Sequence, residues 1–397
     1  MKQGAHNPDD CTACAICTMH CPVAAATLKF RGPKLTGPTY ERFRLSGFED
    51  NASVAYCSNC KNCEIACPSG VPVADFNMLA RADYSARHGH SARDMLTGHS
   101  GDLGKLSSRL PAFFLNTGLK NRLTRALLDQ AGIDRRAPLP AFAPLSERRR
   151  LRKKNRGTKA NLALFPGCFT RYYDPNAALD IISLLETAGY TVGVPDEFAC
   201  CGLPLLTGGL SEAARKRAQI NSKILARLAE NNIPVVTPCP SCALMLSREY
   251  GTLFSNDTRV NNYPVSEAGD FILRLISKNR LSLKNARAPR EPLAYHAPCH
   301  LRALGIGLPA LEILKRVPGL QVENMDAGCC GISGSYGFKK GKYEIAMCIG
   351  QDLFRSLKNS GAKLGLSECG TCRVQMTHGS GLPAAHPLSI LCDSLAR

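Results

Sequence analysis

Two copies of one cysteine pattern near the N-terminus constrain the fold of this chain more than any other feature. Each copy reads C-x2-C-x2-C-x3-C-P, and the cysteines are Cys11, Cys14, Cys17 and Cys21 in the first copy and Cys57, Cys60, Cys63 and Cys67 in the second. A C-x2-C-x2-C turn presents three thiolates to one cubic [4Fe–4S] cluster, and in two-cluster ferredoxins the fourth cysteine binds the other cluster. The pattern therefore predicts two [4Fe–4S] clusters. We expect the ligands to be Cys11, Cys14, Cys17 and Cys67 for one cluster, and Cys57, Cys60, Cys63 and Cys21 for the other.

Zinc binding and disulfide bonding are the alternatives for these cysteines. Structural zinc sites pair two C-x2-C units and need neither a third cysteine at the same step nor a Cys-Pro ending. Disulfide frameworks are typical of secreted chains, whereas the first residues, MKQGAHNPDDC, lack the apolar stretch of an export signal. Both alternatives are therefore weaker than the iron–sulfur interpretation.

The length of 397 residues is sufficient for about two to four domains. We place the first domain, a mostly helical ferredoxin with two clusters, at residues 1–97. No apolar run approaches the roughly 18–20 residues that a membrane-spanning helix needs. We therefore expect a soluble or surface-bound protein of the cytoplasm.

Residues 98–158 form a basic bridge that carries most of the net charge of +18. Its apolar residues recur every three or four positions with Lys and Arg between them, a pattern typical of helices that lie on a membrane or pack on a partner protein. These apolar residues are Leu106, Leu110, Phe113, Phe114, Leu119, Leu123, Leu127 and Leu128. A polybasic run follows, with Arg148, Arg149, Arg150, Arg152, Lys153, Lys154 and Arg156.

An anionic membrane surface is the partner that we expect for this bridge, because each nearby cationic side chain gains about 1 kcal/mol there. A partner protein and a solvated linker are the alternatives. Nucleic acid is not expected, because no interleaved aromatic residues, zinc-finger spacing or helix-turn-helix pattern accompanies the basic residues.

The remainder of the chain contains an internal duplication with a period of about 130 residues. In both halves predicted strands alternate with helices, which favours parallel α/β units. We place these units at residues 159–290 and 291–397, so the whole chain is predicted to be an α+β multidomain protein. Each unit has five cysteines in the order C…CCG…C-x2-C. They are Cys168, Cys200, Cys201, Cys239 and Cys242 in the first unit, and Cys299, Cys329, Cys330, Cys369 and Cys372 in the second.

The five thiols of each unit should converge, because the carboxyl ends of parallel strands lie on one edge of a sheet. Gly202 and Gly331 follow the adjacent cysteine pairs and permit the sharp turn that brings both sulfurs inward. Five thiolates exceed the four that tetrahedral zinc accepts. They fit a non-cubane iron–sulfur cluster, or a four-ligand cluster with one spare thiol. Zinc and plain structural or redox thiols remain alternatives.

Four other residues near these patterns have less certain roles. His296 and His300 flank Cys299, but phenylalanine stands at both positions in the first unit, so a repeated ligand role is not supported. They are candidates for proton relay. Cys348 and Cys392 have no counterpart in the other half, and we expect both to be buried and inert.

The order of two [4Fe–4S] motifs followed by two CCG units resembles the iron–sulfur subunits of membrane-associated flavin dehydrogenases and the subunits of heterodisulfide reductases. Within this group the chain resembles most the iron–sulfur subunits of anaerobic glycerol-3-phosphate dehydrogenases. The stretches that carry the resemblance are GPKLTGPTYERFRL, CSNCKNCEIACPS, FPGCF and, above all, CCGISGSYGFKKGKY. The resemblance extends over essentially the whole chain.

This resemblance implies a subunit without flavin that takes electrons from a flavin-containing dehydrogenase and passes them towards menaquinone. It also implies that the subunit anchors its partner at the cytoplasmic face of the bacterial inner membrane, and that the CCG cysteines bind non-cubane clusters. The sequence has no recognisable flavin or nicotinamide motif, so we expect an electron-transfer subunit without catalytic residues. The alternatives are the iron–sulfur subunit of a glycolate or D-lactate oxidoreductase, and an enzyme that reduces a disulfide or a quinone at a CCG cluster.

Overall fold

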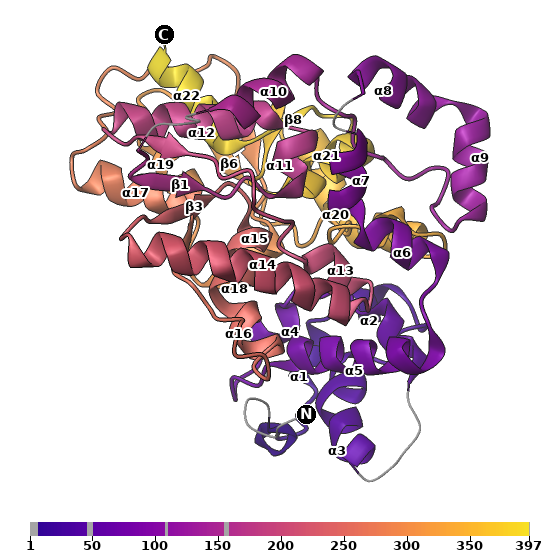
Figure 1. Cartoon of the computed structure of the whole chain (residues 1–397). Coiled ribbons are helices and arrows are strands. Elements are labelled where there is room, and N and C mark those ends of the chain that lie inside the picture. Colours follow the sequence, from indigo (N-terminus) through magenta and orange to yellow (C-terminus); the bar gives the residue numbers. More distant parts are fainter. Residues whose placement is uncertain (1–6, 46–50, 108–109, 155–158, 397) are drawn as a thin grey trace.

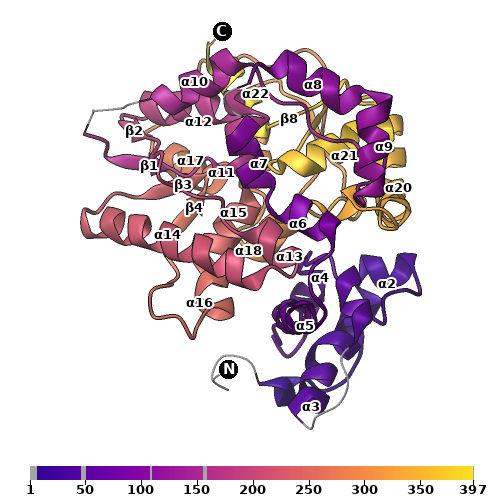
Figure 2. The same ribbon diagram turned by 45° about the vertical axis from the view of Figure 1, so that its right-hand side comes forward.

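The computed structural model describes residues 7–45, 51–107, 110–154 and 159–396 (Figure 1). A small helical part, which contains the N-terminus, lies below a larger body that the rest of the chain builds (Figures 1 and 2). The two parts correspond to the predicted ferredoxin and the predicted α/β units.

The N-terminal part consists of short helices around the two cysteine motifs, and none of its described residues forms a strand. The motifs have the same local fold. In each, the third and fifth residues, Ala13 and Ala15 or Asn59 and Lys61, have positive φ angles, and a short helix begins at the next residue. The elements are η1 (Pro8–Asp10), α1 (Ile16–Met19), α2 (Pro22–Ala26), η2 (Leu35–Thr39), α3 (Tyr40–Leu45), η3 (Ala52–Tyr56), α4 (Asn62–Ile65) and α5 (Val73–His88). The prediction of a mostly helical ferredoxin is confirmed.

Five helices follow, and only some of them pack on the rest of the molecule. They are α6 (Ala92–Gly98), α7 (Ser100–Ser107), α8 (Ala112–Lys120), α9 (Arg122–Gln130) and α10 (Leu145–Lys153). Helices α6, α7 and α10 pack on helices of the first α/β unit. Helices α8 and α9 stand out at one corner, and none of their residues is buried (Figure 1). Among the described helices, none is long and apolar enough to cross a bilayer.

The polybasic run is also divided between the surface and the interior. Arg148 is buried and donates hydrogen bonds to the carbonyl oxygens of Ser107 (3.3 Å) and Leu110 (2.8 Å). This side chain therefore fixes the connection between α7 and α8 instead of facing solvent. Arg156, from the same run, lies outside the described residues.

Each α/β unit contains a four-stranded parallel sheet, and the two sheets have the same topology, with strand orders β2-β1-β3-β4 and β6-β5-β7-β8. The first unit contains β1 (Leu162–Leu164), α11 (Gly167–Tyr172), α12 (Pro175–Thr187), β2 (Val192–Gly193), α13 (Leu203–Thr207), α14 (Ser211–Glu230), β3 (Val235–Thr237), α15 (Pro240–Leu244), η4 (Met245–Glu249), α16 (Tyr250–Leu253), β4 (Val265–Glu267) and α17 (Ala268–Ser277). The second contains β5 (Leu293–Tyr295), α18 (Cys299–Leu304), α19 (Pro309–Lys315), β6 (Val322–Asn324), η5 (Tyr336–Phe338), α20 (Tyr343–Asn359), β7 (Leu364–Leu366), α21 (Gly370–Ser380), β8 (Ala384–Ala385) and α22 (Pro387–Ala396). The predicted duplicated parallel α/β architecture is confirmed.

The two units share one hydrophobic core. Helix α12 packs on α22 and α17 packs on α19, so helices of one unit lie against helices of the other. Buried side chains of both units, such as Leu184, Val236, Tyr295 and Leu311, belong to a single cluster. The duplicated units therefore form one body rather than two independent domains.

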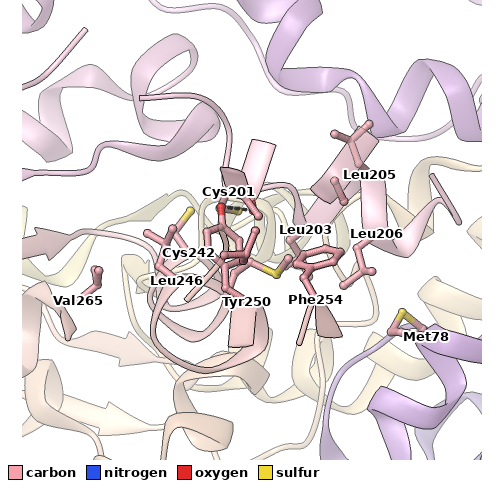
Figure 3. Packing of buried hydrophobic residues seen from close by; sticks show 14 of the residues in the cluster. Met78, Cys201, Leu203, Leu205, Leu206, Cys242, Leu246, Tyr250, Phe254 and Val265 are labelled. Atoms are coloured by element: carbon pink, nitrogen blue, oxygen red, sulfur yellow. Dashed lines mark hydrogen bonds between the residues drawn. The ribbon is translucent and has the colours of Figure 1, made fainter. Parts of the chain in front are cut away.

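A second buried cluster joins the ferredoxin to the first unit. Met78 of α5 belongs to the same cluster as Leu206, Tyr250 and Phe254. Figure 3 shows the Met78 side chain pointing from the ferredoxin helix towards Leu206 and Phe254. This apolar contact holds the cysteine motifs against the α/β body.

Candidate metal centres

One group of ferredoxin cysteines, the first ferredoxin group, contains Cys17 of α1 together with Cys11, Cys14 and Cys67. Burial raises the pKa of the Cys17 thiol, and the nearby Cys11, Cys67 and Cys14 raise this pKa further. The backbone N–H of Val71 donates to the sulfur of Cys67 over 3.3 Å. The structure thus brings Cys67, from the second motif, to the three leading cysteines of the first motif.

The second ferredoxin group is more deeply buried. Cys21 lies beside Cys60 and Cys57, and burial raises the pKa of Cys21 to about 12 and that of Cys57 to about 11. Burial also raises the pKa of Cys63, which neighbours Cys60 and Cys57. Buried thiols of this kind stay protonated unless a metal displaces the proton. Four convergent thiols in this setting fit a [4Fe–4S] cluster, with the fourth cysteine exchanged between the motifs.

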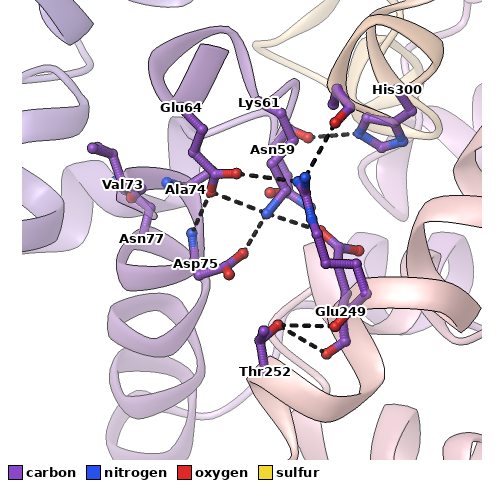
Figure 4. Close-up of polar contacts among 12 residues, drawn as sticks. Asn59, Lys61, Glu64, Val73, Ala74, Asp75, Asn77, Glu249, Thr252 and His300 are labelled. Carbon is purple, nitrogen blue, oxygen red and sulfur yellow. Dashed lines mark hydrogen bonds and ion pairs between the residues drawn. The ribbon is translucent and has the colours of Figure 1, made fainter. Parts of the chain in front are cut away.

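A buried ion-pair network supports the second group (Figure 4). The ammonium group of Lys61 has no solvent exposure and contacts the carboxylates of Asp75, Glu64 (3.2 Å) and Glu249 (2.8 Å). Burial lowers the pKa of Lys61, but the three carboxylates outweigh this effect and raise the pKa well above its ordinary value. Because Glu249 belongs to the first α/β unit, Lys61 ties the cysteine loop to that unit.

The five cysteines of the first α/β unit converge on one edge of its sheet. Burial or hydrogen bonds shift the pKa of every thiol in the group, and the thiols contact one another in the sequence Cys168, Cys200, Cys201, Cys242 and Cys239. Hydrogen bonds from the two neighbours of Cys200 lower its pKa well below the ordinary value. Thiolates are the metal-binding form of cysteine, and the pKa of Cys239 is lowered as well, so these two thiols ionise most readily, whereas a metal would have to displace the protons of the other three.

Glycine and two polar residues shape this group. Gly167 has a φ of +68°, and a Cβ there would lie 2.9 Å from the sulfur of Cys242. Asn221 donates to the carbonyl oxygen of Cys200 (3.1 Å) and to the hydroxyl oxygen of Tyr250 (2.9 Å), which itself donates to the carbonyl oxygen of Cys201 (2.9 Å). Figure 3 shows the Tyr250 side chain close to Cys201 and Cys242. No sequence pattern marks Asn221 or Tyr250, which lie outside the cysteine motifs.

The second α/β unit gathers its five cysteines in the same way. The sulfurs of Cys330 and Cys372 are 3.2 Å apart, and the N–H of Gly331 donates to the sulfur of Cys329 over 3.3 Å. A hydrogen bond from Cys372 lowers the pKa of Cys369 to about 6. This second group therefore also contains thiols that ionise readily.

His296 distinguishes the second group from the first. It is buried, and its ring nitrogen lies with the sulfurs of Cys330 and Cys372 in a set whose members are all within 4.8 Å of one another. One nitrogen and two sulfurs at this spacing could bind a metal ion together. The absence of a histidine in the first unit, where Phe165 stands, argued against a ligand role, but the geometry makes His296 a candidate ligand.

The five cysteines of the second α/β unit, here called the second α/β group, lie between two other groups of cysteines. These are the second ferredoxin group and the five cysteines of the first α/β unit, the first α/β group. Cys60 is close enough to Cys299 and Cys329 to affect the pKa of both thiols. On the other side, a hydrogen bond from Cys242 lowers the pKa of Cys239, and Cys369 is close enough to Cys239 to oppose this effect. A cavity of about 50 Å³, whose lining includes Cys299, Cys329, Cys330, Cys369 and Cys372, opens at this junction.

His300 and Ser333 fix the junction by hydrogen bonds. The two ring nitrogens of His300 contact the hydroxyl of Ser241 and the carbonyl oxygen of Asn59, each over 2.8 Å. The hydroxyl of Ser333 donates to the carbonyl oxygen of Ser58 over 2.6 Å. His300 thus links the ferredoxin, the first unit and its own second unit, a structural role that the sequence did not indicate.

Two buried carboxyl groups lie near the same junction. Burial raises the pKa of Glu267 to about 8, and the neighbouring Glu368 raises this pKa further. Burial raises the pKa of Glu368 to about 7, although its carboxylate accepts a 2.7 Å hydrogen bond from Tyr295. These carboxyl groups were not singled out in the sequence, because only the fold brings the strand ends that carry them together.

Cys348 and Cys392, which have no counterpart in the other α/β unit, differ in solvent exposure. Cys392 is partly buried in the shared core, whereas Cys348 is exposed on α20. The expectation of burial is therefore wrong for Cys348, whose side chain lies on the solvent face of an amphipathic helix.

Comparison with known proteins agrees with this architecture. The 4Fe-4S dicluster domain model matches residues 7–71, and the cysteine-rich domain (CCG) model matches residues 162–247 and 293–377. One of the subunits of the anaerobic glycerol-3-phosphate dehydrogenase of Escherichia coli (strain K12) is 34% identical over 398 residues, which cover 98% of both chains. This chain belongs to the same family.

More distant relatives of this dehydrogenase-subunit family share parts of the pattern. One of the subunits of the fumarate reductase (CoM/CoB) of Methanothermobacter marburgensis is 23% identical over 92% of this chain and 67% of its own length. Lactate utilization protein A 2 of Bacillus cereus (strain Q1) is 28% identical over 45% of this chain and 74% of its own length. Of these three relatives, the glycerol-3-phosphate dehydrogenase protein is the one that matches this chain from end to end.

Proposed function

We propose that this chain is the iron–sulfur electron-transfer subunit of a flavin-containing dehydrogenase that oxidises glycerol 3-phosphate, and that it delivers the electrons to menaquinone. The observation that carries the proposal is the unbroken succession of four thiol groups. It runs from the group around Cys17, which shares a buried cluster with Cys63, through the groups around Cys60 and Cys330 to the group around Cys168. Iron–sulfur clusters bound there would supply one-electron transfer.

The residues around the thiol groups provide what such a path needs. Lys61 and its three carboxylates hold the second ferredoxin loop rigidly against the first α/β unit. His300 and Ser333 hold the same loop against the second unit. Because these contacts are buried, the thiol groups keep fixed separations and limited access to water, two features that set the reduction potential of a cluster.

Full-length similarity supports glycerol 3-phosphate as the substrate of the partner. The relative whose name mentions glycerol-3-phosphate dehydrogenase aligns over 98% of this chain, whereas the lactate utilization protein aligns over 45%. A glycolate or D-lactate partner is therefore the weaker candidate.

Helices α8 and α9 support a peripheral position on the cytoplasmic face of the bacterial inner membrane. They expose Phe113 (73%), Phe114 (68%) and Leu123 (70%), next to the exposed cations Lys120 and Arg122. Apolar side chains that enter the lipid boundary beside cations that meet anionic headgroups are typical of interfacial helices. The chain would thereby hold its flavin-containing partner near the quinone pool.

Anaerobic purification with and without the flavin-containing partner tests the proposal. We expect iron and acid-labile sulfide in the isolated chain, and bleaching of its visible absorbance by glycerol 3-phosphate only when the partner is present. Zinc without sulfide would overturn the electron-transfer role. Reduction of a disulfide or a quinone by the chemically reduced chain alone, at the rate of the complex, would instead favour an enzyme centred on a CCG unit.

A further inference from the structure

A cavity of about 580 Å³ lies where α11, α21 and the segment 138–141 meet, and none of the roles above uses it. Its volume is in the range of small-molecule sites, about 300–1,000 Å³. The lining includes Pro140, Phe169, Tyr173, Arg373 and His386. Both α/β units and the bridge therefore contribute to its walls.

The cavity adjoins the cysteine groups of both α/β units. Phe169 directly follows Cys168, and Gly370 directly follows Cys369. The Phe169 ring lies on the backbone of Gly370, where an added Cβ would be only 2.1 Å from a ring atom. A molecule in the cavity would thus contact residues adjacent to a predicted ligand in each of the two groups.

The side chains of the cavity suit a flat, uncharged molecule with carbonyl oxygens. The rings of Phe169 and Tyr173 are 5.4 Å apart and present an aromatic surface, and the guanidinium of Arg373 lies 5.7 Å from the Phe169 ring centre. The charge of Arg373 is already balanced by its ion pair with Asp174. Its Nε–H is buried and finds no acceptor among the described residues. Because Arg373 itself lines the cavity, a neutral carbonyl oxygen there can accept from its guanidinium group, whereas an anion would meet the carboxylate of Asp174.

The wall of the cavity is attached to the exposed apolar helices. Asn116 of α8 donates to the carbonyl oxygen of Phe142 (3.0 Å) and accepts from its N–H (2.8 Å). Arg125 of α9 donates to the carbonyl oxygens of Arg135 (3.1 Å) and Ala137. The segment 138–141 between these anchors lines the cavity. A molecule that dissolves in lipid would therefore find the cavity directly behind the surface that meets the membrane.

We propose that this cavity binds the naphthoquinone headgroup of menaquinone, with Arg373 as a donor to one carbonyl oxygen and Phe169 against the ring. This inference rests on the proposed function, because it locates the acceptor site of the same electron path. One quinone takes two electrons, delivered singly through the cysteine-held groups from the flavin-containing partner, and two protons from water, and becomes the hydroquinone. No bond to the protein forms.

Calorimetric titration of the anaerobic, cluster-loaded full chain with 2,3-dimethyl-1,4-naphthoquinone tests the site. This probe has no free ring position that could alkylate a thiol. We expect one molecule to bind per chain. In Ala141→Trp a bulky ring at an exposed position of the lining should fill the cavity and weaken binding at least tenfold. Ala229→Trp, at an exposed position of α14, should bind as the wild type does.

Arg373→Gln provides a second variant, with an expected five- to tenfold loss of affinity. This change also removes the cation that pairs with Asp174, so Arg373→Gln could fold poorly. In that case the affinity of Ala141→Trp alone tests whether the cavity binds the quinone. Equal binding by wild type and Ala141→Trp, or no binding by the wild type, would overturn the site.

Bleaching of the cluster absorbance by the flavin-containing partner, measured without quinone, separates this inference from the proposed function. Normal bleaching in Ala141→Trp together with lost binding supports the site. Normal bleaching of a wild-type chain that binds no naphthoquinone removes the site and leaves the electron-transfer role intact. If bleaching fails in the wild type, the proposed function fails, while the titration still decides whether the cavity binds a quinone.

Discussion

Lys61 and Glu249 form a 2.8 Å ion pair between Nζ and Oε1 across the boundary of the ferredoxin and the first α/β unit, with side-chain exposures of 0% and 1%. The two residues are far apart in the chain, and each would be strongly destabilising if it were buried alone. Their pairing makes the position of the second cysteine motif depend on the α/β body.

Lys61→Met should destabilise the protein by about 3–5 kcal/mol, because three carboxylates would lose the fully buried cation that they share. We expect the second ferredoxin cluster to be lost preferentially, as measured by iron content and by electron paramagnetic resonance. The double variant Lys61→Met/Glu249→Gln should recover part of the stability. Arg215→Gln, which breaks an exposed pair with Glu212, serves as the control. A variant with unchanged melting temperature and spectrum would contradict this view of the network.

Cys21→Ser and Cys60→Ser should remove the same cluster signal, although the two residues belong to different motifs. The reason is that Cys21 lies beside Cys60 and Cys57. Cys14→Ser and Cys67→Ser should together affect the other signal. Electron paramagnetic resonance after reduction with dithionite distinguishes the two clusters, and Cys348→Ser, at an exposed position, should change neither. If Cys21→Ser instead matched Cys14→Ser, each motif would hold its own cluster.

Asp94 should stabilise the attachment of α6 at neutral pH and lose this effect in acid. Burial raises the pKa of Asp94, but Lys339, at 2.7 Å, and Arg81 outweigh it and hold the pKa well below the ordinary value. A lowered folded pKa gives stability that is complete above the unfolded pKa of about 3.9 and is lost as the pH falls through the folded pKa. The melting temperature of Asp94→Asn should therefore lie below that of the wild type at pH 6–8, and the difference should shrink below about pH 4.

The control for this measurement is Asp83→Asn. Asp83 pairs with Arg87 on the surface of α5, and such pairs contribute only about 0.2–1 kcal/mol. A gap between wild type and Asp94→Asn that stayed constant down to acid pH would show that the charge of Asp94 is not the cause.

Phe113→Ser/Phe114→Ser should reduce binding to vesicles of anionic lipid by about a hundredfold or more, because burying each ring contributes roughly 1.5–3 kcal/mol. Flotation of the chain with such vesicles measures the effect, and moderate salt should weaken the wild-type binding by screening the basic side chains. Leu28→Ser, which replaces a fully exposed side chain of the ferredoxin, should have no effect. Equal flotation of both variants would place the membrane contact elsewhere.

Gly331→Ala should disrupt the second α/β group, whereas Gly334→Ala should be tolerated. Both glycines have positive φ angles, of +84° and +62°, but a Cβ at Gly331 would lie 1.9 Å from the carbonyl oxygen of Ala346, while nothing lies within 4 Å at Gly334. We expect Gly331→Ala to lower the iron content and Gly334→Ala to cost about 1 kcal/mol of stability only. Similar iron content in both variants would mean that the tight turn after Cys330 is not required.

The sequence was sufficient to predict the local order of the fold. The repeated cysteine spacing predicted the ferredoxin, and strands alternating with helices at a period of about 130 residues predicted the duplicated parallel sheets. These features depend on spacing along the chain, which the sequence contains directly.

Contacts between distant segments could not be predicted in the same way. In the sequence, nothing distinguishes Lys61 from the other cations of this basic chain. Only the folded structure places it against Glu249. His296 has no histidine counterpart in the first unit, so comparison of the two repeats argued against a ligand role. The structure nevertheless places it close to Cys330 and Cys372. Arg148 was counted with the polybasic run that we expected at a membrane surface, although it is buried and donates hydrogen bonds to backbone carbonyls.

Helix α7 lies directly over the first α/β group. A Cβ at Gly101 would be 2.9 Å from the Cβ of Cys200 and 3.6 Å from that of Cys168, and one at Gly104 would meet the ring of Tyr172. Any assembly factor that delivers iron and sulfide to these thiols must therefore act before α7 settles into place, or must displace the helix. On either route, the final packing of α7 on these cysteines would follow the delivery of iron and sulfide.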